Sequence, residues 1–134
     1  MSVLRSRAVD HVGIAAVSSD SALGDLVGPV GLLTEMPSGV AVGRFGPGDT
    51  LELVVPARPG SPIERFLDRR GPGLHHIGFR VDEPLEDVLE RLEAAGVHVI
   101  GKVEPSSDGR PSLFIHPSET GGVLIELVEG PRPT

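Results

Sequence analysis

Two short segments of this sequence each occur twice, and this internal repeat limits what the chain can fold into. The segment DHVGI at residues 10–14 resembles HHIGF at residues 75–79, and LELV at residues 51–54 resembles IELV at residues 125–128. The spacing between the two segments differs between the halves of the chain. Such a repeat is typical of one structural module present twice, with loops of different length between its fixed strands.

Both halves predict the same order of elements, which is a strand, a helix and three further strands. Segments rich in β-branched residues indicate strands at residues 8–17, 32–36, 40–45 and 50–55 in the first half, and at 74–81, 97–103, 112–116 and 123–129 in the second. A short helix is expected within residues 18–30, and an amphipathic helix opens at Pro84 and ends at Gly96. A helix that opens with the capping-box sequence SPIE connects the two halves. The expected fold is therefore α+β, one domain over residues 1–134 made of two βαβββ modules, at about 8–56 and 73–130, joined by a connector helix at about 61–70.

One acidic residue interrupts each repeated apolar strand. Because side chains alternate between the faces of a strand, Glu52 lies with Val54 on one face, and Glu126 lies with Leu124 and Val128. A buried, unpaired carboxylate would cost several kcal/mol. Each glutamate is therefore expected to have a compensating partner.

The repeated histidines provide such a partner. His11 shares its strand face with Gly13 and Ala15, and His76 shares its face with Gly78, so that both histidines have small neighbours. The chain has no cysteine, so any metal ion must be held by imidazole and carboxylate groups. We therefore predict a divalent-metal site with open coordination positions, and Co, Ni, Mn, Fe and Zn all remain possible. Its expected ligands are His11, Glu52, His76 and Glu126.

The other histidines have simpler explanations. A single histidine in a strand is more often a hydrogen-bonded core residue than a metal ligand, but the same His–Glu pair in both halves argues against that explanation for His11 and His76. His75 is expected on the face opposite His76. His116 could approach a substrate or simply be hydrogen-bonded in a turn, and His98 is expected to be solvated.

Composition excludes several kinds of partner. The formal net charge is −7, and the chain has no Trp or Tyr and only four Phe, which argues against a nucleic-acid surface. The sequence contains no apolar run of membrane-spanning length and no signal peptide, so a cytoplasmic protein is expected. An anionic substrate would need a local basic patch, and the densest one in the sequence consists of Arg65, Arg69 and Arg70.

These segments resemble the vicinal oxygen chelate superfamily, which includes glyoxalases and dioxygenases. Among its members they look most like methylmalonyl-CoA epimerases. The similarity extends over nearly the whole chain and is carried by the segments DHVGIA from residue 10, LEL from residue 51, SPI from residue 61, GLHHIGF from residue 73, FIHP from residue 114 and GGVLIEL from residue 121. The resemblance implies paired βαβββ modules that form a curved sheet around a metal site.

The resemblance also implies roles for individual residues. The four positions named above would bind a divalent metal, and an acyl-CoA thioester would be inverted at its α-carbon through an enolate. Glu126 is the first candidate for proton transfer. Some family members carry a glutamate at the position aligned with Val42, which leaves Glu52 as the candidate for the second proton transfer. Arg110 and Ser112 are candidates for binding a substrate carboxylate, although an exposed turn arginine is an equally good description of Arg110.

Two other functions remain open at this point. The same scaffold supports glyoxalase-type isomerases and lyases, and a metal–enolate strategy serves these reactions too. The valine at position 42 instead favours a non-enzymatic protein that binds a small molecule. We also expect a homodimer, because paired-module proteins of this size commonly dimerise.

Overall fold

A computed structural model describes residues 4–20 and 22–133, and its contacts divide the chain into two compact units. One unit is His11–His75, and the other combines Met1–Asp10 with His76–Thr134. The division therefore falls within the first strand of each predicted module, not in the connector between them. Each unit is described separately below.

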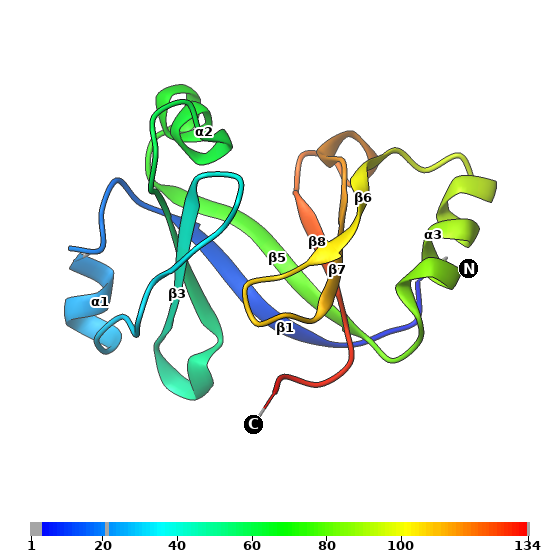
Figure 1. The fold of residues 1–134 in the computed structure, drawn as a ribbon, viewed down its shortest axis with the longest axis horizontal. Coiled ribbons are helices and arrows are strands. Elements are labelled where there is room, and N and C mark those ends of the chain that lie inside the picture. Colours follow the sequence, from blue (N-terminus) through cyan, green and yellow to red (C-terminus); the bar gives the residue numbers. More distant parts are fainter. Residues whose placement is uncertain (1–3, 21, 134) are drawn as a thin grey trace. The chain divides into compact units, whose positions relative to one another are not determined.

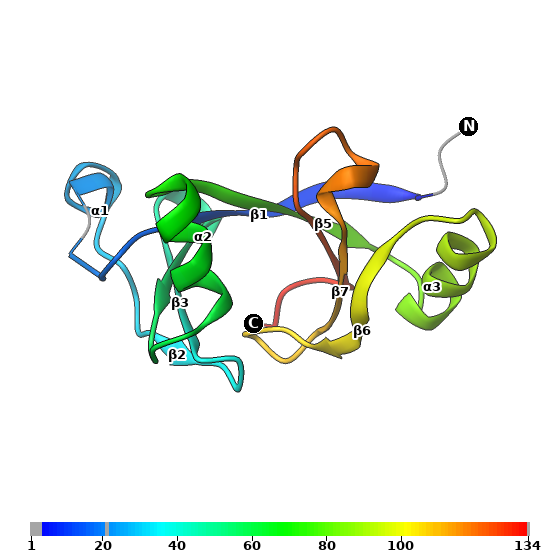
Figure 2. The ribbon, with the colours of Figure 1, turned by 90° about the horizontal axis from the view of Figure 1, so that it is seen from above.

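The unit His11–His75 contains four strands in the order β2-β3-β4-β1. β1 runs parallel to β4, whereas β3 is antiparallel to both β2 and β4. Two helices and a 3-10 turn complete this unit, and both helices can be seen in Figure 2. The elements are β1 (Ser6–Ala15), α1 (Ala22–Val27), β2 (Thr34–Glu35), β3 (Val40–Phe45), η1 (Pro47–Asp49), β4 (Leu51–Pro56) and α2 (Pro62–Arg70).

Side-chain alternation along β4 divides the core of this unit into two apolar clusters. Leu53 and Val55 pack on the face that is covered by α1 and the segment after it. Val54 packs on the other face, together with Ala15 and Val42. Ile63 of α2 closes that second cluster. The face that carries Glu52 is therefore apolar at the α2 end.

The predicted strand at residues 32–36 is shorter in the structure. Only Thr34–Glu35 pairs with β3, while the preceding segment packs over the outer face of the unit. At Gly43 of β3, a β-carbon would lie 2.8 Å from the Leu33 side chain and 2.9 Å from that of Val30. Val30 and Leu33 therefore pack closely on the sheet face, because the strand beneath them has no side chain at this point.

The connector helix α2 begins with a modified capping box. The Ser61 hydroxyl accepts a hydrogen bond from the Glu64 backbone N–H at 3.3 Å, as the sequence predicts. The Glu64 carboxylate accepts from the Gly60 N–H, also at 3.3 Å, one residue before the position expected for a capping box. Both hydrogen bonds join residues at the start of the helix.

The second unit has the strand order β5-β8-β7-β6, with β5 parallel to β8 and the other pairs antiparallel. Figure 1 shows α3 running beside these strands, and its buried side chains Leu85, Val88 and Leu92 pack against Leu113 and Leu127. The elements are β5 (Gly73–Val81), α3 (Leu85–Ala94), β6 (Val99–Pro105), β7 (Pro111–Ile115), η2 (Pro117–Glu119) and β8 (Ile125–Glu129).

The predicted α+β class and its two βαβββ modules are confirmed. The helix that follows Pro84 ends with Gly96 at a positive φ of 74°, as expected for a helix C-terminus.

Within the described part of the chain, no helix has the length and apolar character needed to cross a bilayer.

Candidate metal-binding site

The first His–Glu pair lies in the unit His11–His75. In the register of β1 and β4, Gly13 is directly opposite Glu52, so that the carboxylate extends over a position without a side chain. His11 is one alternating position before Gly13 and therefore shares its face. His11 Nε2 lies 3.9 Å from Glu52 Oε1, and both side chains are buried.

The second unit repeats this arrangement with the same register. Gly78 of β5 is opposite Glu126 of β8, and His76 is one alternating position before Gly78. His76 Nε2 lies 3.3 Å from Glu126 Oε1, and both side chains are again buried. The Phe114 ring packs edge-on to the His76 ring with centroids 6.0 Å apart. The sequence repeat thus becomes a geometric repeat of two buried His–Glu pairs.

Each pair offers one imidazole nitrogen and one carboxylate oxygen, which is half of the predicted set of metal ligands. Two donor atoms bound at right angles, each about 2.1 Å from one ion, stand about 3 Å apart. The His76–Glu126 separation of 3.3 Å is close to this value, and the His11–Glu52 separation of 3.9 Å is too long for a direct hydrogen bond. Imidazole nitrogen and carboxylate oxygen together suit Mn, Fe, Co, Ni or Zn. The residues present therefore fit a divalent ion.

Arg110, which the sequence analysis places near a substrate carboxylate, is instead enclosed by protein acceptors. Its Nη1 and Nη2 each donate to one Asp10 oxygen at 2.9 Å. Nη1 also donates to the Gly130 carbonyl, while Nε and Nη2 contact the Asp108 carboxylate. The side chain is 7% exposed. Because these partners occupy the whole guanidinium fork, the geometry does not favour a substrate-binding role for Arg110.

Ser112 and His116 also have partners within the protein. The Ser112 hydroxyl donates to the Glu104 carbonyl at 3.1 Å in the hairpin of β6 and β7. His116 Nδ1 accepts from the Ser118 backbone N–H at 3.0 Å and so caps η2. The His116 ring also stacks on the exposed His98 ring, with centroids 4.4 Å apart. These contacts match the turn-histidine alternative for His116 and give Ser112 a structural hydrogen bond.

The basic residues of α2 lie at the surface. Arg65 donates to the Gly60 carbonyl at 2.7 Å, and the Arg70 guanidinium lies 5.8 Å from the centre of the Phe66 ring. Phe66 also meets the His75 ring edge-on at 4.8 Å. His75 therefore packs against α2, consistent with its expected position away from His76.

One charged residue beside the predicted ligands is not among the site residues predicted from the sequence. Arg44 of β3 is directly opposite Glu52 of β4, and its Nε lies 3.5 Å from Glu52 Oε2. Arg44 shares its face with Val42, which is packed in the apolar cluster of Ala15, Val54 and Ile63. Side-chain alternation along β3 could have indicated its position, because Arg44 lies two residues after the core residue Val42 and therefore on the same face.

The Asp108–Arg110 contact predicts a pH dependence of stability. Partial burial would raise the pKa of Asp108, but hydrogen bonds from the Arg110 side chain and backbone N–H, and from Ser106, outweigh it and lower the pKa. A carboxyl with a lowered pKa stabilises the fold above its unfolded-state pKa, and this contribution is lost as the pH falls through the folded-state pKa. In urea titrations, Asp108→Asn should therefore lower the free energy of unfolding by about 1–2 kcal/mol at pH 7. The difference from the parent protein should shrink below about pH 4. A difference that stays constant down to pH 2 would contradict this assignment.

Comparison with known proteins identifies the family of this chain. The family model of the glyoxalase/bleomycin resistance protein/dioxygenase superfamily matches residues 10–114. The uncharacterised protein YqjC of Bacillus subtilis is 36% identical over 128 residues, which cover 90% of this chain and 91% of YqjC.

Two solved structures are similar over nearly their whole length. Methylmalonyl-CoA epimerase from Mycobacterium tuberculosis is 31% identical, with a TM-score of 0.83 over 98% of this chain and 93% of that chain. A variant of the Streptomyces coelicolor methylmalonyl-CoA epimerase in complex with 2-nitronate-propionyl-CoA is 27% identical, with a TM-score of 0.80 over 93% of this chain and 95% of that chain. This chain therefore belongs to the glyoxalase/bleomycin resistance protein/dioxygenase superfamily and is similar in sequence and structure to methylmalonyl-CoA epimerases.

Proposed function

We propose that this protein is a metal-dependent epimerase that inverts the carbon alpha to the thioester of methylmalonyl-CoA or of a closely related 2-substituted malonyl-CoA. The observation that carries the proposal is the duplicated buried His–Glu pair, placed in the same register in both units. Similarity to solved methylmalonyl-CoA epimerases supports the reaction and the acyl-CoA substrate class.

The proposed metal ligands are one imidazole and one carboxylate from each unit, His11 with Glu52 and His76 with Glu126. When bound, a divalent ion would supply Lewis-acid stabilisation of the negative charge that develops on the substrate thioester oxygen. The two carboxylates would balance the charge of the ion, and the four ligands would leave positions open for substrate oxygens.

The protein side chains would then move the proton. Epimerisation requires a proton acceptor and a proton donor on opposite faces of the planar enolate. We assign Glu126 to one face, since its cross-strand neighbour on β7 is Phe114 and not a cation. We assign Glu52 to the other face, because Val42 cannot carry a proton and is enclosed in an apolar cluster.

Val42 also favours a second candidate function, a non-catalytic protein that binds an acyl-CoA. The two functions differ in one observable property. An epimerase exchanges the substrate α-hydrogen with deuterated solvent, whereas a binding protein leaves this hydrogen in place. Exchange with methylmalonyl-CoA, and no turnover of a glutathione hemithioacetal, would also separate the proposed epimerase from a glyoxalase-type isomerase.

Metal analysis of purified variants tests the proposed site. His11→Ala should bind less metal than the parent protein, by at least tenfold in affinity, because one nitrogen donor is lost. His98→Ala is the matched control, since His98 is exposed and is not one of the four proposed ligands. This control should retain the parent metal content and exchange rate. Unchanged metal content in His11→Ala would show that His11 is a packing residue and would remove the proposed site.

A further inference from the structure

Two histidines outside the proposed metal site stack on each other at one end of the second unit. His98 precedes β6 and His116 follows β7, and the His116 backbone N–H donates to the His98 carbonyl at 3.0 Å. The two residues therefore extend the pairing of β6 and β7 by one position beyond Val99 and Ile115. Their ring centroids are 4.4 Å apart, and the ring planes are inclined by 8°. This cross-strand contact holds the His116 ring in one orientation.

The His116 ring caps the turn that follows it. Its Nδ1 accepts a hydrogen bond from the Ser118 backbone N–H at 3.0 Å and lies 2.8 Å from the Ser118 hydroxyl oxygen. A neutral imidazole accepts at one nitrogen and donates at the other, so this cap requires the ring proton to be on Nε2. The cap of η2 therefore exists only while Nδ1 carries no proton.

Protonation of His116 would reverse the role of Nδ1. An imidazolium ring carries an N–H group at both nitrogens and cannot accept a hydrogen bond. Its Nδ1–H would donate to the Ser118 hydroxyl, and the Ser118 backbone N–H would lose its acceptor. A second positive charge on the stacked His98 ring would repel the first, because the ring centroids are only 4.4 Å apart. Imidazole is the side chain that changes charge between about pH 5 and pH 8, so this reversal falls in mildly acidic solution.

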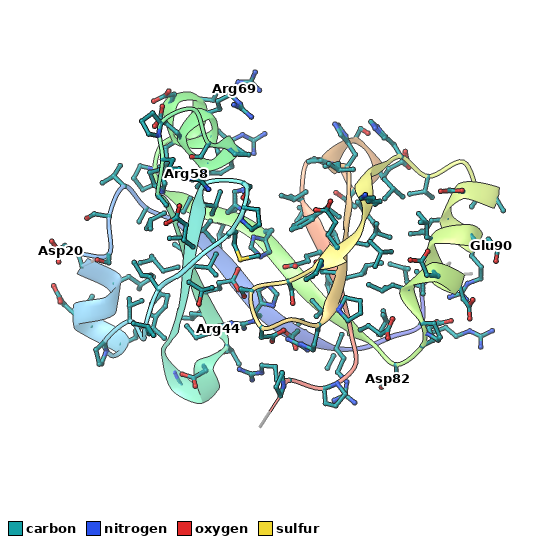
Figure 3. The ribbon with its side chains drawn as sticks, in the orientation of Figure 1. Asp20, Arg44, Arg58, Arg69, Asp82 and Glu90 are labelled. Atoms are coloured by element: carbon teal, nitrogen blue, oxygen red, sulfur yellow. The ribbon has the colours of Figure 1, made fainter. Side chains whose placement is uncertain are left out.

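No carboxylate among residues 4–20 and 22–133 forms an ion pair with either ring. The helix α3 packs on the core face of β6 and β7, and side-chain alternation places the two histidines on the other face. Figure 3 shows the exposed Glu90 on the side of α3 away from the strands. The charged residues of the elements that flank the two rings also form no ion pair with them, and these are Lys102 and Glu104 in β6 and Glu119 in η2. The charge of His116 is therefore not fixed by an ion pair and follows the pH of the solution.

The turn capped by His116 leads into the strand that carries Glu126. Phe114 is opposite Glu126 in the register of β7 and β8, and His116 lies two positions after Phe114 and so shares its face. Glu126 contacts His76 at 3.3 Å. Loosening of this turn would therefore act at one end of the face that carries Glu126.

We propose that His116 is a pH-sensitive cap of the turn between β7 and β8. At neutral pH its Nδ1 binds the Ser118 N–H and keeps the turn closed. In mildly acidic solution the protonated ring releases this N–H, and the turn loosens. The proposal does not depend on the proposed function, because it concerns a hydrogen bond within the protein.

Amide hydrogen exchange of the full chain, followed by NMR, tests the cap. The protection factor of the Ser118 N–H removes the intrinsic pH dependence of exchange, and it should fall about threefold or more between about pH 8 and about pH 5. The Gly109 N–H donates to the Ser106 carbonyl at 3.0 Å in another turn of the same unit, and this internal control should keep its protection. His116→Asn should keep the protection of Ser118 as well, because an asparagine oxygen caps without titrating.

Several results would overturn the proposal. One is unchanged protection of Ser118 at about pH 5, whether the His116 ring has stayed neutral or has taken up a proton without releasing the N–H. An equal loss of protection in His116→Asn would place the pH dependence elsewhere in the turn. A parallel loss at Gly109 would indicate general loosening of the unit. The comparison of Ser118 with Gly109 uses the parent protein, so it decides the question even if His116→Asn does not fold.

Discussion

Glu126→Gln is expected to slow epimerisation by two to four orders of magnitude, which is the usual contribution of a positioned acid or base. Glutamine has nearly the shape of glutamate and can still offer an oxygen to a metal ion, but it cannot accept the proton. Deuterium incorporation, followed separately from each epimer of methylmalonyl-CoA, measures the effect. Glu126→Gln should stop exchange from one epimer and leave the other to exchange through Glu52.

The complementary variant makes this prediction specific. Glu52→Gln should show the opposite epimer preference, because the two carboxylates serve opposite faces of the enolate in our assignment. Glu104→Gln provides a control with the same chemical change at an exposed position of β6, and it should behave as the parent protein does. If Glu126→Gln epimerises at the parent rate, Glu126 is not a proton-transfer group. If Glu52→Gln loses both exchange reactions together with its metal, Glu52 is a ligand only.

Arg110→Met is expected to lower the free energy of unfolding by about 3–5 kcal/mol, because it leaves the buried Asp10 carboxylate without its cation. Both side chains are less than one-tenth exposed, and the pair joins residues 100 positions apart in sequence. Burial would lower the pKa of Arg110, but its hydrogen bonds to Asp10 and Asp108 outweigh this effect and raise it. Urea unfolding followed by circular dichroism measures the loss, since the chain has no Trp or Tyr for fluorescence.

A double-mutant cycle separates the ion pair from general damage to the core. Asp10→Asn combined with Arg110→Met should be less destabilised than the sum of the two single changes, because neither charge is then left alone. Arg91→Met is the control, since its pair with Glu83 is 40% and 23% exposed, and ion pairs at the surface contribute little to stability. An Arg110→Met variant as stable as Arg91→Met would show that the Asp10 pair does not hold this unit together.

The local pattern of the sequence was sufficient for much of the fold. Alternation along residues 51–55 correctly divided Glu52 and Val54 from Leu53 and Val55, because side-chain direction in a strand depends only on position. Pro84 and Gly96 correctly marked the ends of α3. The strand at residues 32–36 was predicted too long, since Leu33 packs over an outer face and only Thr34–Glu35 extends the sheet.

By itself, the sequence determined that the chain consists of two copies of one module, each with a buried histidine and a buried glutamate. Residue type and alternation carry this information, and both are local properties. Only the tertiary structure decided which partners the arginines contact. Arg110 and Arg44 are both long, flexible cations, and each contacts an acidic residue from another strand, Asp10 and Glu52 respectively. Asp10 and Asp108 occupy the fork of Arg110, whereas Arg44 lies beside Glu52, and no local pattern distinguishes these two outcomes.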